Sequence, residues 1–206
     1  MLLCRSKKVR EDLIKRYSIL PIAHVKLLKG QERKSCTGNL LTDSYYVFSY
    51  QKDGESKSFL CGIHAAYHFL ELIKHPKLPL FDPLSRNQDS SSINKNIENY
   101  TDQNKQWHPA AKQLYNAIHL LIICWKIEPK AALKDIKSKL EKTMENEPDI
   151  RLVKAINTII SRDISKRTIQ EMIQELRVEN ENMRTFHFDL LTELLLKNKI
   201  EQSFYE

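Results

Sequence analysis

The pattern of apolar and polar positions divides the chain into parts with different periodicities. Over residues 1–81, short apolar runs alternate with turn residues, which predicts a small module of helices and strands. Residues 82–108 are rich in Asn, Ser, Gln and Asp, and we expect a polar linker or long surface loop there. Over residues 109–206 the apolar positions recur at helical spacing, which predicts a helical bundle. The expected fold class is therefore mainly α, with a small α+β module before an all-α bundle.

The first predicted helix, over residues 5–17, is amphipathic and basic, and Pro21 is expected to interrupt the chain after it. The formal net charge is +7, and residues 1–34 hold ten Lys or Arg against three Asp or Glu, which accounts for the whole excess. Nucleic acid or an acidic protein is therefore expected to meet this segment, although a solvated basic face would explain the same charge. The candidate phosphate-binding residues are Arg5, Lys7, Lys8, Arg10, Lys15 and Arg16.

A hairpin followed by a helix is predicted in the rest of the module. Residues 45–50 and 58–61 are rich in strand-forming side chains, and Asp53-Gly54 between them supplies a turn. Gly62 ends the second strand, and a helix is expected over residues 63–74. Aromatic side chains of the first strand could stack on bases, although alternate ones must face the core; they are Tyr45, Tyr46, Phe48 and Tyr50.

Five helices are predicted in the C-terminal part. The first, over residues 110–125, is apolar nearly all round and should be buried at the centre of the bundle. Pro129 is expected to open the second helix, Asp149 to cap the third and Ser165 to cap the fourth. The last helix is expected over residues 182–199.

One local arrangement has the residue types of a metal site. Cys61 and His64 lie three residues apart where the hairpin meets the next helix, so both can face one point. Cys36 precedes the hairpin, beside a turn that contains Gly38. A ligand in a turn, then a hairpin, then a helix start with two ligands resembles the treble-clef class of zinc modules, over about residues 33–74. The resemblance is incomplete, because the usual second cysteine of the first pair is missing near Cys36.

The resemblance implies a structural zinc ion with four nitrogen or sulfur ligands. His68 follows His64 by four residues on the same helical face, which makes it a convenient ligand. Cys4 and His24 stay open as alternatives for the fourth position. The competing interpretation is that Cys61 packs as a small apolar residue and the histidines are hydrogen-bonded surface groups. The candidate metal ligands are Cys36, Cys61, His64 and His68.

Together these features favour a non-enzymatic accessory subunit that binds nucleic acid or docks on a larger protein assembly through its bundle. The alternatives are a small metal-dependent nuclease, with the metal on His64 and His68, and a protein-interaction scaffold without nucleic-acid contact. Four scattered cysteines predict no disulfide framework and favour reduced thiols in the cytoplasm. No export signal is visible, and the longest apolar run, residues 118–125, is too short to cross a bilayer, so no membrane contact is expected.

Overall fold

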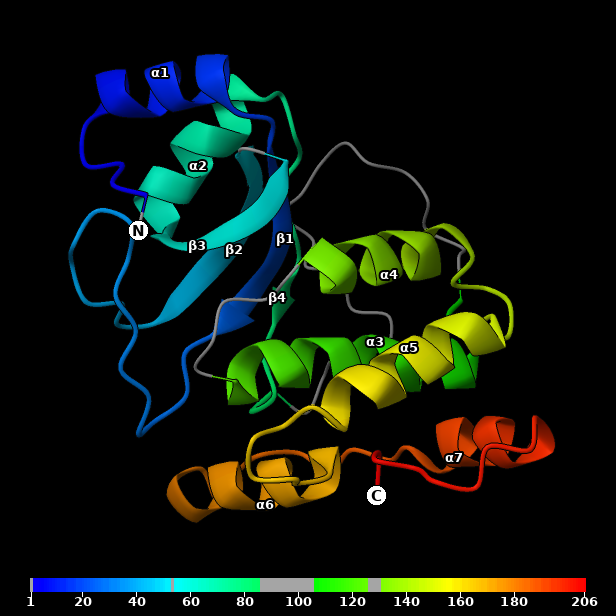
Figure 1. The fold of residues 1–206 in the computed structure, drawn as a ribbon. Coiled ribbons are helices and arrows are strands. Elements are labelled where there is room, and N and C mark those ends of the chain that lie inside the picture. The colour runs from blue at the N-terminus through cyan, green and yellow to red at the C-terminus, as the bar shows by residue number, and fades with distance from the viewer. Residues whose placement is uncertain (1, 53, 86–105, 126–130) are drawn as a thin grey trace. The chain divides into compact units, whose positions relative to one another are not determined.

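The protein, described here by a computed structural model, consists of an α+β N-terminal part and a helical C-terminal part (Figure 1). The chain forms two compact units. The N-terminal unit comprises Met1–Phe81 with Ile122–Asp135, and the helical unit comprises Asp82–Leu121 with Ile136–Glu206. The structure describes residues 2–52, 54–85, 106–125 and 131–206.

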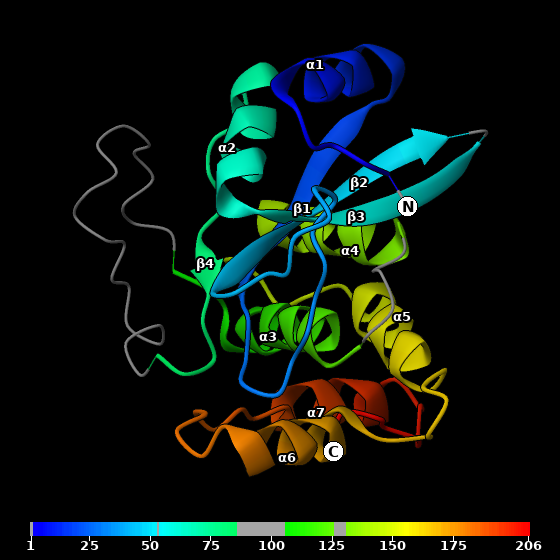
Figure 2. The same cartoon turned by 90° about the vertical axis from the view of Figure 1, so that its left-hand side faces the viewer.

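The N-terminal unit is built on a four-stranded sheet in the order β3-β2-β1-β4 (Figure 2). Strand β1 spans Ile19–Lys26, β2 spans Ser44–Lys52 and β3 spans Glu55–Gly62. These three strands pair antiparallel, whereas the short strand β4, Leu80–Phe81, runs parallel to β1. Because β2 lies between β1 and β3, its side chains form the middle of the module, and seven of its nine residues are buried.

The predicted hairpin is confirmed, but the sheet around it is larger than expected. β2 and β3 stay in register along their length, and Gly54 in the turn has a φ of +78°, which suits glycine. Pro21 does not interrupt the chain as predicted, because β1 runs through it. The register between β1 and β2 shifts between Pro21 and Ala23, so the proline, which has no N–H to donate, sits at an irregularity of the ladder.

Two helices, α1 (Lys7–Arg16) and α2 (Ile63–Leu72), lie side by side over one face of this sheet (Figures 1 and 2). The core beneath them is aromatic. Phe48 of β2, Phe59 of β3 and Phe69 of α2 meet with ring centroids 5.4 to 5.5 Å apart. This packing fixes α2, and with it the first residues after β3, on the sheet.

The C-terminal part contains the predicted number of helices among the residues that the structure describes. The cap predicted at Asp149 is confirmed, because its carboxylate accepts a hydrogen bond from the backbone N–H of Arg151 at 2.8 Å. The expectation for Pro129 lies outside the described residues. Among the helices so described, none has the length and apolar character needed to span a bilayer. The helices are α3 (Pro109–Cys124), α4 (Ala131–Lys142), α5 (Ile150–Ile160), α6 (Ile169–Glu179) and α7 (Asp189–Lys197).

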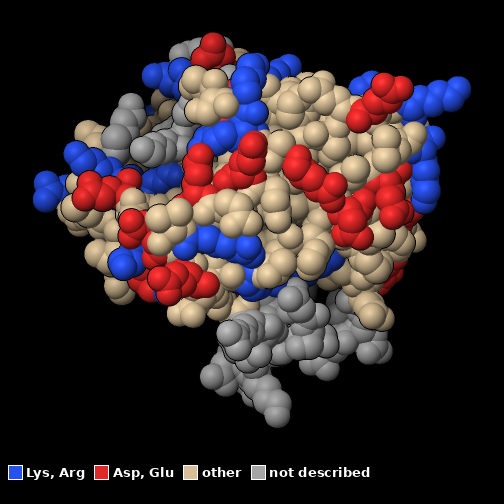
Figure 3. Space-filling model, turned by 90° about the horizontal axis from the view of Figure 1, so that it is seen from below, with Lys and Arg blue, Asp and Glu red and all other residues tan. Residues whose placement is uncertain are grey.

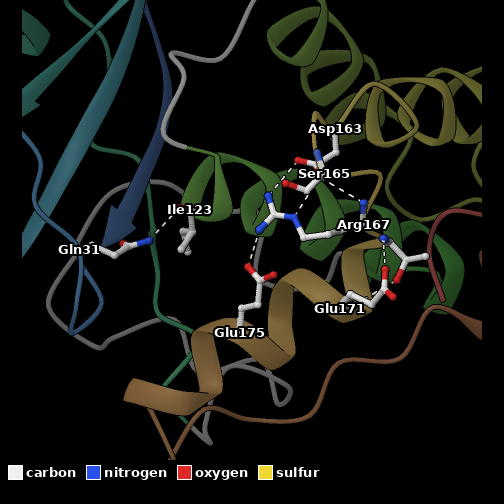
Figure 4. A network of polar contacts seen from close by, with 8 residues as sticks. Gln31, Ile123, Asp163, Ser165, Arg167, Glu171 and Glu175 are labelled. Atoms are coloured by element: carbon white, nitrogen blue, oxygen red, sulfur yellow. Dashed lines mark hydrogen bonds and ion pairs between the residues drawn. The ribbon is translucent and has the colours of Figure 1, made fainter.

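The C-terminal end of α3 belongs to the N-terminal unit, and that unit caps it. Gln31 donates through Nε2 to the carbonyl of Ile123 at 2.9 Å (Figure 4). Arg33 donates to the carbonyls of Ile123 and Trp125 at 2.9 and 2.7 Å. Because the last carbonyls of a helix have no partner within the helix, these two side chains supply the missing donors.

Helix α6 begins later than predicted, since its N-cap is Thr168 and not Ser165. The Thr168 hydroxyl accepts from the backbone N–H of Glu171, and the Glu171 carboxylate accepts from that of Thr168 (Figure 4). This reciprocal pair is a capping box. Upstream, the Asp163 carboxylate accepts from the backbone N–H groups of Ser165 and Arg167, which holds that stretch as a turn.

The last helix is also shorter than the predicted 182–199. Residues 182–188 are not helical, although Met183, Phe186 and Phe188 within them are buried. The backbone N–H of Arg184 bonds to the carbonyl of Pro83 at 3.0 Å, outside any helix. The apolar spacing correctly predicts that side chains of this segment are buried, but its prediction of a helix there is wrong. Tertiary packing can bury side chains from an irregular segment as well.

Candidate functional site

Three cysteine sulfur atoms meet in the core of the N-terminal unit. Cys4, Cys36 and Cys61 are all buried, and their sulfur atoms lie within 4.8 Å of one another. Cys4 and Cys36 form a disulfide, while Cys61 is a free thiol whose sulfur is 3.8 Å from that of Cys36. We call this group the three-sulfur centre.

The backbone brings the three cysteines together. The N–H of Cys4 donates to the carbonyl of Cys36 at 2.9 Å, and the N–H of Cys36 donates to the carbonyl of Leu60 at 2.7 Å. Gly38 turns the loop after Cys36 with a φ of +88°, a conformation that glycine adopts without strain. The segment before α1, the loop before β2 and the end of β3 are therefore joined by main-chain hydrogen bonds, and each contributes one sulfur.

The Cys4–Cys36 disulfide corrects the expectation of reduced cysteines. The two residues are 32 positions apart, and sequence spacing gives no measure of their distance once the chain is folded. Cys36 and Cys61 lie together as the sequence predicted, and Cys4 joins them as the third sulfur. Three cysteines in this position can hold a metal, but a cysteine binds a metal as its thiolate, so the disulfide counts against a bound ion.

Arg10 is directed toward this centre. Its side chain is buried, and its guanidinium donates to the carbonyl of Cys4 at 2.8 Å and to that of Arg5 at 3.4 Å. Within the described parts of the chain it has no carboxylate partner. The phosphate-binding role predicted for Arg10 is therefore wrong for this conformation. The signal was present in the sequence, because Arg10 is three residues from Leu13 and shares the apolar face of the helix.

The two predicted histidine ligands lie on α2 but do not complete the centre. Nδ1 of His68 accepts a hydrogen bond from Nε of Arg10 at 3.1 Å, so the proton of the neutral ring is on its other nitrogen. His64 is exposed in the first turn of α2. Among the described residues, the ligand atoms that come within 4.8 Å of one another are the three sulfurs alone.

His24, the other imidazole considered for the fourth ligand, takes part in a different cluster. Its ring is buried, lies 3.1 Å from the hydroxyl of Ser44 and 3.3 Å from the carbonyl of Leu78, and stacks on Tyr46. Burial lowers the pKa of His24, against smaller opposing effects of the Leu78 carbonyl and of Asp43. A neutral ring packed between strands in this way stabilises the sheet.

The electrostatics of the free thiol follow from its surroundings. Burial raises the pKa of Cys61 to about 12, while the positive charge of Arg10 acts in the opposite direction. In the disulfide form the Cys61 thiol is therefore protonated and uncharged near neutral pH. It behaves as a small apolar residue until another group stabilises its thiolate.

The remaining predicted phosphate-binding residues lie on the surface. Within the described residues none of them forms an ion pair, and they are Arg5, Lys7, Lys8, Lys15 and Arg16. The predicted aromatic contribution is wrong, because the four aromatic side chains of β2 are all buried and none can stack on a base; they are Tyr45, Tyr46, Phe48 and Tyr50. The aromatic side chains of β2 therefore provide no stacking platform beside these cations.

The fold and the site define a protein made of two parts. One is an α+β module with a buried three-sulfur centre, and the other is a helical unit. The chain belongs to the family described as Uncharacterised conserved protein UCP028583, which matches residues 4–204. No curated protein and no solved structure matches the chain.

Proposed function

We propose that this protein is a non-enzymatic accessory subunit that binds nucleic acid through Arg5 and the exposed face of α1 and docks on a larger assembly through its helical unit. The observation that carries the proposal is the two-sided character of α1. Lys7, Lys8, Lys15 and Arg16 are exposed, whereas Arg10 and Leu13 are buried and anchor the opposite side. A helix fixed in this way presents its cations from a backbone that is already ordered before binding, which favours contacts to phosphates.

The charge distribution elsewhere supports this assignment. On the face seen in Figure 3, acidic side chains lie beside basic ones, so a polyanion there would meet repulsion together with attraction. Helix α6 carries Glu171, Glu175 and Glu179 and makes such a face. Helix α1 carries Glu11 and Asp12 as well, but its first turn contains no acidic residue, and its exposed cations outnumber these two carboxylates.

The proposal extends to the metal. In the reduced protein, the thiolates of Cys4, Cys36 and Cys61 would hold zinc, with His64 as the fourth ligand, or His68 once its Nδ1 atom is released from Arg10. Tetrahedral zinc with bonds of about 2.3 Å separates its sulfurs by roughly 3.8 Å, and the Cys36 and Cys61 sulfurs are 3.8 Å apart. The ion would be structural, since its chemistry here is to fasten the segment before α1 to the sheet.

Fluorescence anisotropy with labelled single-stranded DNA, duplex DNA and RNA tests the proposal. Five phosphate contacts, from Arg5 and the four exposed cations of α1, predict that the logarithm of the affinity falls with the logarithm of salt concentration with a slope of about −3.5 to −4.5. The variant K7E/K8E/K15E/R16E should bind at least tenfold more weakly, by about 1.4 kcal/mol or more. The matched control K139E/K142E reverses two exposed cations of α4 and should bind as the wild type does.

The same measurements separate the alternatives. If the wild type shows no salt-dependent binding to any of these nucleic acids, or if the α4 control loses affinity equally, the nucleic-acid proposal is overturned. Retrieval of an acidic protein that the α1 variant fails to retrieve would then favour the interaction scaffold. Cleavage of the labelled strand with a divalent metal, abolished in H64A/H68A, would favour the nuclease.

A further inference from the structure

We propose that the three-sulfur centre is a redox-gated metal site in which Arg10 supplies the balancing positive charge and the Cys4–Cys36 disulfide is the metal-free form. The inference rests on the metal centre proposed above and adds its regulation. It is independent of nucleic-acid binding.

The first argument is that two states of the centre compete for the same atom. The sulfur of Cys36 is bonded to Cys4 and is also 3.8 Å from the sulfur of Cys61. A sulfur in a disulfide is not a thiolate, and a cysteine binds zinc as its thiolate. The disulfide and a zinc ion bound by all three thiolates therefore exclude each other. Since all three sulfurs are already within 4.8 Å of one another, passing between the states needs only small side-chain movements.

The second argument is the buried charge of Arg10. In the described structure its guanidinium bonds only to neutral acceptors, namely the carbonyls of Cys4 and Arg5 and the Nδ1 atom of His68. A buried cation without an anionic partner is costly. Forming the Cys4–Cys36 disulfide removes two of the three thiolates that could offset this charge, because a disulfide is neutral. The hydrogen bonds of Arg10 account for its anchoring of α1, but they do not balance its charge.

The metal-bound state supplies the missing charge. Three thiolates and one divalent ion carry a net charge of −1, which Arg10 balances. Its hydrogen bond to the Cys4 carbonyl puts Arg10 in contact with the backbone of one ligand, which is how groups outside a metal's ligand set orient and tune the ligands. Arg10 is therefore a positioning residue for the centre.

The gating step balances with a peroxide as the oxidant. The thiolates of Cys4 and Cys36 lose two electrons and form their S–S bond. Hydrogen peroxide accepts both electrons and two protons, its O–O bond breaks, and two water molecules form. Cys61 remains as a single sulfur ligand, takes up a proton and releases the ion to water.

The experiment measures zinc and disulfides together on the full chain. Protein reduced with a phosphine and equilibrated with zinc is freed of excess metal, analysed for bound zinc and then titrated with hydrogen peroxide. A chromophoric chelator follows the released zinc, and mass spectrometry of alkylated peptides follows the disulfide. We expect stoichiometric zinc in the reduced protein and release in step with the Cys4–Cys36 bond.

The outcomes are distinct. Reduced protein that takes up no zinc overturns both this inference and the metal centre, while the nucleic-acid proposal stands or falls by its own salt titration. Zinc that stays bound after the disulfide has formed overturns the gating alone. The variant C61S keeps both partners of the disulfide, and zinc binding as tight as that of the wild type would contradict the three-thiolate site.

Variants at Arg10 test the charge. R10Q keeps a donor for the Cys4 carbonyl but removes the charge, and it should lower zinc affinity by about 10- to 100-fold in competition with the chelator. R10K restores the charge and should recover most of that loss. K52M, which removes an exposed cation at the end of β2, should bind zinc as the wild type does. Equal affinity of R10Q and R10K would overturn the role of Arg10.

Discussion

Arg10 of α1 donates a hydrogen bond from Nε to Nδ1 of His68 on α2, 3.1 Å away. The sequence assigned Arg10 to a phosphate contact and His68 to a metal, yet the two residues bond to each other beside the three-sulfur centre. The bond joins the helix that carries the exposed cations to the helix that follows Cys61. Helix α1 is therefore anchored in part by the buried side chain of Arg10 and by His68 of α2, neither of which is among its exposed cations.

The disulfide should contribute measurably to the stability of the oxidised protein. Replacing Cys4 with Ser removes the cross-link, and we expect the free energy of unfolding to fall by about 2–4 kcal/mol. Urea denaturation in a metal chelator measures this. A phosphine reductant should lower the stability of the wild type to that of C4S and leave C4S unchanged. A reductant that destabilises both proteins equally would contradict the assignment.

The start of α6 offers a test of its cap. Thr168→Ala removes the hydroxyl that accepts from Glu171 and should lower the free energy of unfolding by about 1 kcal/mol. Ser165→Ala is the matched control, since the exposed Ser165 lies in the turn before the helix, and it should change stability by less than about 0.5 kcal/mol. Thermal or urea unfolding of both variants gives the comparison. A larger effect at Ser165 would place the cap where the sequence suggested.

The buried carboxylate of Asp163 should matter more than the exposed one of Glu175. Arg167 bonds to both (Figure 4), and its guanidinium holds the pKa of Asp163 below its usual range. Asp163→Asn weakens charge-assisted hydrogen bonds at a buried position and should cost about 1.5–3 kcal/mol. Glu175→Gln removes a solvent-exposed partner and should cost less than about 1 kcal/mol. Chemical denaturation that ranks the two variants in the opposite order would refute this division.

His119 should make the protein less stable in mild acid. Burial lowers the pKa of His119 to about 3, and the positive charges of Lys137 and Lys112 act in the same direction. The pKa in the unfolded chain is about 6.5, so below that pH the unfolded state binds the proton that the folded state rejects. Stability is therefore lost as pH falls from about 6.5 toward 3, by about 2 kcal/mol between pH 7 and 5.

Unfolding of His119→Gln across this range is the measurement. We expect the variant to lose this part of the pH dependence, whatever its stability at pH 7. The matched control His187→Gln, at an exposed position, should keep the wild-type profile. Carboxylates do not confuse the comparison, because most titrate below pH 5. Parallel profiles for the wild type and His119→Gln would show that His119 is not responsible.

Several elements of the fold could be predicted from local signals in the sequence. Asp53-Gly54 between two strand-forming runs predicts the hairpin, and Asp149 before an apolar periodic run predicts a cap, because both depend on residues close in sequence. The treble-clef resemblance implies the approach of Cys36 and Cys61, and the hairpin brings the start of β2 beside the end of β3. These features need no knowledge of the rest of the fold.

What the sequence did not predict depends on tertiary contacts. Cys4 joins the centre through a main-chain bond to a residue 32 positions away. Arg10 turns inward because its partners come from the segment before the helix and from α2. Ser165 and Thr168 are equally good capping residues, and the choice is made by Asp163, which fastens the preceding turn.

The main-chain hydrogen bond from Cys36 to Leu60 also affects whether two copies of the protein can associate through their β-sheets. Strand β3 is at the border of the sheet, and a border strand is a template onto which a strand of another molecule can add. The amide of Cys36 occupies the Leu60 carbonyl, and the hydroxyl of Ser35 accepts from the amide of Gly62 at 3.4 Å. At this end of β3 the chain thus covers its own border and protects itself against strand-to-strand aggregation.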